Sequence, residues 1–178
     1  MVRLLWGLTL LCNITAFATV EVYFSPSTEC EDRIVKAIEE SRTEIMAAVY
    51  SVNNRKIAQA LQAAKGRGVK VRLLTDAVQA ASHSSLALPL LAQGLDVRLH
   101  SKFKIEHNKF GIYDGKLVST GSFNWTGPAA RSNSENCVFL DDSATLAKFK
   151  ERFEFLWNKN TADGSLAKVT KLKNKAAH

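Results

Sequence analysis

The hydrophobic positions of the chain change period several times between residues 20 and 52. VEVYFSP, residues 20–26, alternates between apolar and polar side chains and predicts a strand that ends at a proline. Ile34, Val35 and Ile38 follow at helical spacing, behind Ser27-Thr28, either of which can cap a helix. TEIMAAVYSV, residues 43–52, is almost continuously apolar and predicts a buried strand.

The same succession continues over residues 53–100. NNRKIAQALQAAKGRG begins with asparagines suited to an N-cap and stops at two glycines, which predicts a helix. VKVRLLTD, residues 69–76, predicts a strand, and a helix weakened by Pro89 follows as far as Gly94. LDVRLH, residues 95–100, predicts another strand. Strands that alternate with helices favour a parallel sheet with helices on both faces.

The alternation with helices stops after residue 100. HNKFGIYD and KLVSTGS are two strand-like runs joined by Asp114-Gly115, a strong signal for a two-residue hairpin. SENCVFLDD predicts a further strand, and Ser143 can cap a helix that carries apolar residues as far as Trp157. We therefore expect an α/β fold, a mostly parallel mixed β-sheet flanked by helices on both faces, in one domain over residues 19–160.

The two ends of the chain differ from this domain. Residues 1–18 contain Arg3, an apolar run that begins at Leu4, and Ala16-Phe17-Ala18, which is the layout of a signal peptide cleaved after residue 18. A retained membrane anchor or an amphipathic targeting segment is the alternative. Residues 161–178 are basic and poor in large apolar groups, so we expect a flexible tail. A signal peptide predicts a periplasmic or secreted protein.

Composition excludes some classes of protein but identifies no function. The 178 residues are 46% apolar and 23% charged, unlike a disordered or collagen-like chain. The net charge of +7 favours polyanions such as nucleic acid or anionic lipid, although an ordinary soluble basic protein can carry it too. Cys30 and Cys137 remain after the predicted signal peptide, and a disulfide or two buried free thiols both fit them.

Residues suited to phosphodiester chemistry gather in the strand-like run from His107 to Asn124. Side chains two apart on a strand share a face, so His107 and Lys109 project together. The ammonium keeps the imidazole neutral and nucleophilic, and it can also neutralise a phosphate oxygen. Ser122 and Asn124 have the same spacing and offer donors for phosphoryl oxygens. Gly121 before them lacks a side chain and would let a ligand approach the backbone.

Each of these residues also has a plainer explanation when taken alone. A single strand histidine is more often structural, Lys109 can simply be solvated, and Asp114-Gly115 is ordinary turn chemistry. The joint spacing, His-x-Lys-x4-Asp-x6-Gly-Ser-x-Asn, resembles the signature of the phospholipase D superfamily. The chain is similar to short, exported bacterial endonucleases of that superfamily, because it is short, begins with a signal-like segment and carries one copy of the motif.

The resemblance implies roles for six candidate catalytic residues. His107 would attack phosphorus and form a phosphohistidine, Lys109 and Asn124 would bind the phosphate, and Ser122 would assist. Glu135 is the candidate for the acidic residue that orients the histidine, and a carboxylate on the second ring nitrogen would also stabilise the positive charge that develops. Asp114 belongs to the signature as well, but its place at a hairpin turn indicates support of geometry more than chemistry.

The single motif further implies a homodimer. Superfamily enzymes use two histidines, one as nucleophile and one as acid, whereas His83, His100 and His178 belong to no second copy of the pattern. Two chains would then share one active site across a two-fold axis. No metal or other cofactor follows from these residues, because no set of Asp, Glu and His is clustered and the two copies of Lys109 can supply the positive charge.

The substrate expected from this resemblance is nucleic acid, DNA and also RNA. Lys102 and Lys104 are candidate substrate-binding residues, and Arg98, Lys116 and Arg131 add basic charge around the motif. No base-reading motif is apparent, which predicts cleavage without sequence preference. The alternative is a phospholipase D-type lipid phosphodiesterase or phosphatidyl transferase, although no amphipathic membrane-binding helix is evident and no stable membrane association is expected. The intact His107 and Lys109 disfavour a third class, a noncatalytic nucleic-acid-binding protein.

Overall fold

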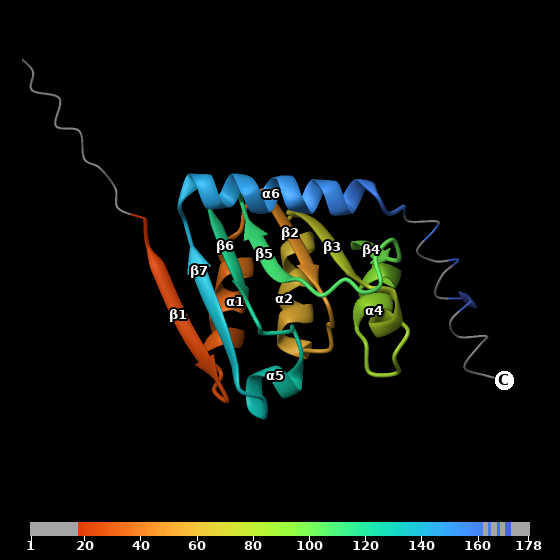
Figure 1. Ribbon diagram of the computed structural model, residues 1–178, viewed down its shortest axis with the longest axis horizontal. Helices are drawn as coiled ribbons and strands as arrows, with labels where there is room; N and C mark the ends of the chain where they lie inside the picture. Colours follow the sequence, from red (N-terminus) through yellow and green to blue (C-terminus); the bar gives the residue numbers. More distant parts are fainter. Residues whose placement is uncertain (1–17, 162–163, 165–166, 168–169, 172–178) are drawn as a thin grey trace, which may run out of the picture.

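Seven strands form one sheet in the order β1-β7-β6-β5-β2-β3-β4 (Figure 1). The computed structural model describes residues 18–161, 164, 167, 170 and 171. The elements, in chain order, are β1 (Val20–Ser25), α1 (Glu29–Glu40), β2 (Glu44–Val49), α2 (Arg55–Gly66), β3 (Lys70–Asp76), α3 (Ala77–Ala80), α4 (Ala87–Ala92), β4 (Asp96–His100), β5 (Lys109–Tyr113), β6 (Leu117–Gly121), α5 (Gly127–Arg131), β7 (Glu135–Leu140) and α6 (Ser143–Asn158).

The predicted α/β fold with a mixed, helix-covered sheet is confirmed, but the prediction that most strands are parallel is wrong. Only β2–β3 and β3–β4 are parallel among the described pairings, and the other four pairs are antiparallel. The reason is that β5 pairs antiparallel with β2 on one side and with β6 on the other. β1 does not join the parallel part, because it lies at the edge beside β7.

Helices cover both faces of the sheet because the strands are apolar on both faces. In β2, Ile45, Ala47 and Val49 join the larger core, beneath α1, α2 and α4. Met46 and Ala48 alternate with them and join a second core, beneath α6. Figure 1 shows α6 on one side of the sheet and the other long helices on the opposite side. A near-continuous apolar strand is the sequence pattern that such two-sided burial requires.

The element boundaries follow the predicted signals with four exceptions. The helix expected up to Gly94 is two short helices, α3 and α4, separated by residues 81–86. The β5–β6 hairpin has three residues, 114–116, between the paired Tyr113 and Leu117, and not two. Asp142, not Ser143, caps α6 by accepting from the amide of Thr145 at 2.8 Å. The five-residue α5 was not anticipated at all.

The predicted signal peptide, residues 1–18, lies outside the described residues except for Ala18. The same holds for most of the predicted flexible tail, residues 161–178, so both stay predictions. Among the residues that the structure describes, no helix is long and apolar enough to cross a membrane.

Cys30 and Cys137 form a disulfide that joins α1 to β7, so of the two states that the sequence allowed, the structure shows the oxidised one. Both residues are buried in the larger core. The two cysteines are 107 residues apart in sequence. Closing so long a loop removes much conformational freedom from the unfolded chain, and this is the main way in which such a bond stabilises the fold.

The double variant Cys30→Ala/Cys137→Ala is expected to have a free energy of unfolding lower by about 2–5 kcal/mol, because its unfolded chain is no longer cross-linked. Denaturant unfolding followed by circular dichroism measures the difference. Wild-type protein unfolded with a reductant present should approach the variant. Equal midpoints for oxidised wild type and variant would contradict the stabilising role.

Candidate functional site

His107 and Lys109 lie side by side at the start of β5, the middle strand of the sheet. The Lys109 Nζ donates to the main-chain oxygen of His107 at 2.6 Å. The ring of Tyr50 lies against both, with its centroid 4.6 Å from the His107 ring centroid and 5.0 Å from Lys109 Nζ. The expected pairing of imidazole and ammonium is therefore present, and Tyr50 is a third member that sequence reasoning missed.

Ser122 and Glu135 form the second part of the site. The Ser122 hydroxyl donates to Glu135 Oε2 at 2.5 Å and accepts from the amide of Asn136 at 3.0 Å. Burial lowers the pKa of Lys109, and the carboxylates of Glu135 and Glu106 oppose this shift. The two parts are carried by neighbouring strands, because β6 lies between β5 and β7 in the sheet.

Asn124 was expected to bind phosphate and Glu135 to orient the histidine. The Asn124 Oδ1 is buried and has no hydrogen-bond partner within the described residues, so this amide is not consumed by internal contacts. The Glu135 carboxylate binds Ser122 and the Asn133 amide, and among the described residues it makes no hydrogen bond to His107. Its role in orienting the histidine stays a prediction.

Gly121 is needed for the close approach of β7, a structural role that the sequence did not indicate. Its φ is +144°, and a Cβ there would collide with the main-chain oxygen of Asn136. That oxygen accepts from the amides of Ser122 at 3.1 Å and Phe123 at 3.2 Å. The missing side chain thus lets β7 approach closely, and this approach sets the position of Ser122.

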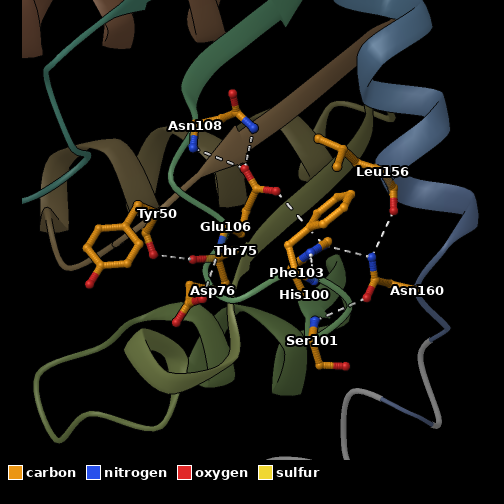
Figure 2. Close-up of polar contacts among 10 residues, drawn as sticks. All are labelled: Tyr50, Thr75, Asp76, His100, Ser101, Phe103, Glu106, Asn108, Leu156 and Asn160. Atoms are coloured by element: carbon orange, nitrogen blue, oxygen red, sulfur yellow. Dashed lines mark hydrogen bonds and ion pairs between the residues drawn. The ribbon is translucent and has the colours of Figure 1, made fainter.

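A buried polar network fixes the backbone on both sides of His107 (Figure 2). Asp76, at the end of β3, accepts from the amide of Glu106 at 3.1 Å through Oδ2, while its Oδ1 caps α3. Glu106, which is 1% exposed, accepts from Asn108 twice through Oε1, from the amide nitrogen at 3.1 Å and from Nδ2 at 2.6 Å. The two residues that flank His107 in sequence are therefore both fixed by carboxylates.

His100 belongs to this network and does not complete a second catalytic pair beside His107. It is buried, its ring stacks on Phe103, and its Nε2 accepts from the Phe103 amide at 3.0 Å. Its Nδ1 lies 3.0 Å from Asn160 Nδ2 and 3.9 Å from Glu106 Oε2. Burial lowers the pKa of His100, with Glu106 and Asp76 opposing. The ring therefore supports the loop that leads into β5.

Asp114 makes structural contacts, as its place at the hairpin turn indicated, and it lies far from His107. It lies seven residues beyond His107, at the other end of β5, and strand geometry puts about 20 Å between the two. Its carboxylate accepts from the amides of Arg42, Thr43 and Glu44 and from the Thr43 hydroxyl. Burial alone would raise the pKa of Asp114, but these hydrogen bonds outweigh it and lower the pKa to about 2.

The basic residues expected around the motif divide into two groups. Lys102 and Lys104 are exposed in the segment that leads to His107, and Arg131 is exposed at the end of α5. Arg98 is not available to a ligand, because its Nη1 donates to the main-chain oxygens of Trp157 and Asn160 and its guanidinium lies 4.1 Å from the Trp157 ring centroid. Lys116 lies in the hairpin turn beside Asp114, remote from His107.

Comparison with known proteins identifies a matching family and several relatives. Residues 34–157 match the family described as cardiolipin synthase, PLD-like domain. The chain is 32% identical over 125 residues to the mitochondrial cardiolipin hydrolase of Mus musculus, which covers 70% of this chain and 57% of that protein. It is 35% identical to the phospholipase D of Rickettsia conorii, covering 75% of this chain and 67% of the other. The chain spans about half the length of several cardiolipin hydrolases that it matches.

Two solved structures superpose on most of the chain. Nuc from Salmonella typhimurium, a phospholipase D family member, superposes with a TM-score of 0.77 at 33% identity, covering 82% of this chain and 97% of Nuc. NucT from Helicobacter pylori has a TM-score of 0.74 at 25% identity, covering 82% of this chain and 99% of NucT.

Asp114→Asn is expected to lower the free energy of unfolding by about 1–2 kcal/mol at neutral pH, because the amide binds the backbone donors less strongly than the carboxylate. The folded pKa is depressed, so the stabilisation is complete above the unfolded pKa of about 4 and is lost as pH falls toward 2. Urea unfolding of both proteins between about pH 2 and 7 measures this. A difference that did not shrink with falling pH would contradict it, and the NMR shifts of His107 should not change.

Proposed function

Since the chain belongs to the family of phospholipase D-like domains, we propose that it is a metal-independent phosphodiesterase that cleaves nucleic acid without sequence preference. One observation carries the proposal. The His107 ring is exposed, makes no hydrogen bond within the described residues and lies beside Lys109, as a nucleophile and an anion-binding cation should. Ser122 and Asn124 add a hydroxyl and an amide at the same end of the sheet.

The reaction has two steps. A ring nitrogen of His107 attacks phosphorus, and the new N–P bond forms as the P–O bond to the leaving oxygen breaks; that oxygen takes up a proton from an acid. Water then attacks the phosphohistidine, breaks the N–P bond and gives its proton to the same group, now acting as a base. Lys109 and Asn124 stabilise the charge that gathers on the phosphoryl oxygens. Because Lys109 supplies positive charge, the proposal needs no metal ion.

The acid in this proposal is His107 of the partner subunit in a homodimer. His100 is buried and engaged with Phe103 and Asn160, and His83 lies in the 81–86 loop, where it lines a cavity with Arg55 and Arg131. His100 is therefore unavailable as the acid, and His83 belongs to no second copy of the motif. A second copy of the exposed His107, related by a two-fold axis, fits the role.

Charge supports nucleic acid as the substrate. Lys102 and Lys104 are exposed just before His107, and the chain has a net charge of +7. Such residues bind backbone phosphates whatever the base sequence. Lipid hydrolysis is the second candidate, favoured by relatives named cardiolipin hydrolase and phospholipase D and by Phe103 and Ile105, which are exposed between and beside these lysines.

Purified protein, with EDTA present, is expected to nick plasmid DNA, and His107→Ala is expected to lower the rate by at least about 1000-fold because the nucleophile is gone. Agarose electrophoresis measures nicking, and cardiolipin vesicles assayed in parallel measure lipid hydrolysis. Lipid turnover without nicking would favour the second candidate. Loss of all activity in EDTA, restored by a divalent ion, would refute the metal-independent reaction.

A mixture of subunits tests the shared site. Dimers with one wild-type and one His107→Ala subunit, separated by two affinity tags, are expected to lose nearly all activity, because each site needs a histidine from both chains. Sedimentation should give twice the mass of one chain for all three dimers. A mixed dimer that keeps half the wild-type activity would show that each chain acts alone.

A further inference from the structure

A cavity of about 470 Å³ opens among three segments, the residues before α2, the loop between α3 and α4, and the start of α5. A smaller cavity of about 190 Å³ adjoins it, and both are lined by Asn53, Arg55, Gly127 and Arg131. The first turn of α2 and α5 come together at the lower edge of the molecule in Figure 1. His83 and the hydroxyl-bearing Ser84 and Ser85 complete one wall of the larger cavity.

The two arginines in this cavity have no partner that neutralises them. Within the described residues, Arg55, Arg131 and His83 make no ion pair and no side-chain hydrogen bond, and all three are exposed. Glu31, the one carboxylate on the wall of the smaller cavity, is already bound to Lys56 at 2.7 Å and to the Asn54 side chain. Because Lys56 already neutralises Glu31, the two arginines in the cavity repel each other, and a ligand with negative charge would relieve this repulsion.

The position of Arg131 depends on a glycine. A Cβ at Gly127 would collide with the Arg131 guanidinium, so the bare backbone leaves the space in which that group lies. Gly127 itself is held by its amide, which donates to Asn53 Oδ1 at 2.9 Å. Arg55 stands at the N-terminal, electropositive end of the twelve-residue α2. The wall is thus positive from side chains and from the helix.

The cavity lies close in the chain to Asn124, which the proposed function assigns to phosphate binding. The main-chain oxygen of Trp125 accepts from the amides of Asn53 and Asn54 at 2.9 and 3.0 Å, and Asn124 immediately precedes Trp125. Gly127 follows Asn124 by three positions, so their Cα atoms are at most about 11 Å apart. A strand whose scissile phosphate is bound by Asn124 can therefore place a neighbouring phosphate in the cavity.

We propose that Arg55, Arg131 and His83 form a second phosphate subsite, which binds a phosphate next to the scissile one on the same polynucleotide strand. The inference rests on the proposed function for the identity of the strand. Arginine guanidinium groups bind phosphate through two parallel hydrogen bonds, so the subsite contributes to binding and to the register of the strand. It has no role in the bond changes at His107.

The test compares Arg55→Gln/Arg131→Gln with wild type on two substrates. On a labelled single-stranded oligonucleotide, KM is expected to rise about tenfold or more while kcat stays within about threefold, because the two guanidinium groups bind the strand and do not act in the reaction. On bis(4-nitrophenyl) phosphate, which has one phosphate, kcat/KM is expected to be unchanged. The slope of log KM against log salt should also become shallower by about 0.7 for each phosphate that the variant no longer neutralises.

Lys70→Gln/Lys116→Gln is the matched control, because it removes the same charge from exposed positions at the other end of the sheet. An oligonucleotide KM and salt slope equal to those of this control would overturn the subsite, as would an equal loss on both substrates. If wild type hydrolyses neither substrate, the proposed function fails instead. The subsite is then decided by fluorescence anisotropy in the His107→Ala background, where only the replacement of Arg55 and Arg131 should weaken oligonucleotide binding.

Discussion

A buried carboxylate has to be hydrogen-bonded or paired, and the position of His107 depends on how Glu106 meets that requirement. Glu106 cannot reach water, so its Oε1 binds both nitrogens of Asn108 across the histidine, while its own amide is bound by Asp76. The same Asp76 caps α3, so the end of β3, the start of a helix and the entry to β5 share one carboxylate. The exposed imidazole is thus attached to a backbone that has little freedom to move.

The sequence predicted the elements well and their pairing less well. Strand and helix periods are local, so the strands near residues 20, 45, 70 and 97 and the helices between them could be placed from spacing alone. Which strand lies beside which is not local. β5 lies between β6 and β2, and β1 pairs with β7 more than 100 residues away, so the antiparallel pairs outnumber the parallel ones. Repetition of strand and helix could not reveal this.

The candidate site shows the same division. Spacing of two residues brought His107 and Lys109 together correctly, because side-chain alternation is a property of the strand itself. The turn signal placed Asp114 in the hairpin, but Asp114 and Lys116 were still grouped with the residues around His107, which lie at the other end of β5. Tyr50 and Asp76 were missed because they come from the ends of β2 and β3. The acidic residue Glu106, directly before the motif, was the one feature of the sequence that could have indicated the buried polar network beside His107.

The two ends of β5 have different roles, one in the candidate site and one in stability. His107 and its polar network lie at one end. Asp114 lies at the other, where its carboxylate accepts hydrogen bonds from three backbone amides at the start of β2. Substitutions at sites this far apart, with no shared partners, change free energy additively. The Asp114 end can therefore accumulate changes that adjust thermal tolerance without altering the geometry at His107. For protein engineering, the fold offers a stability region that can be optimised independently of its chemistry.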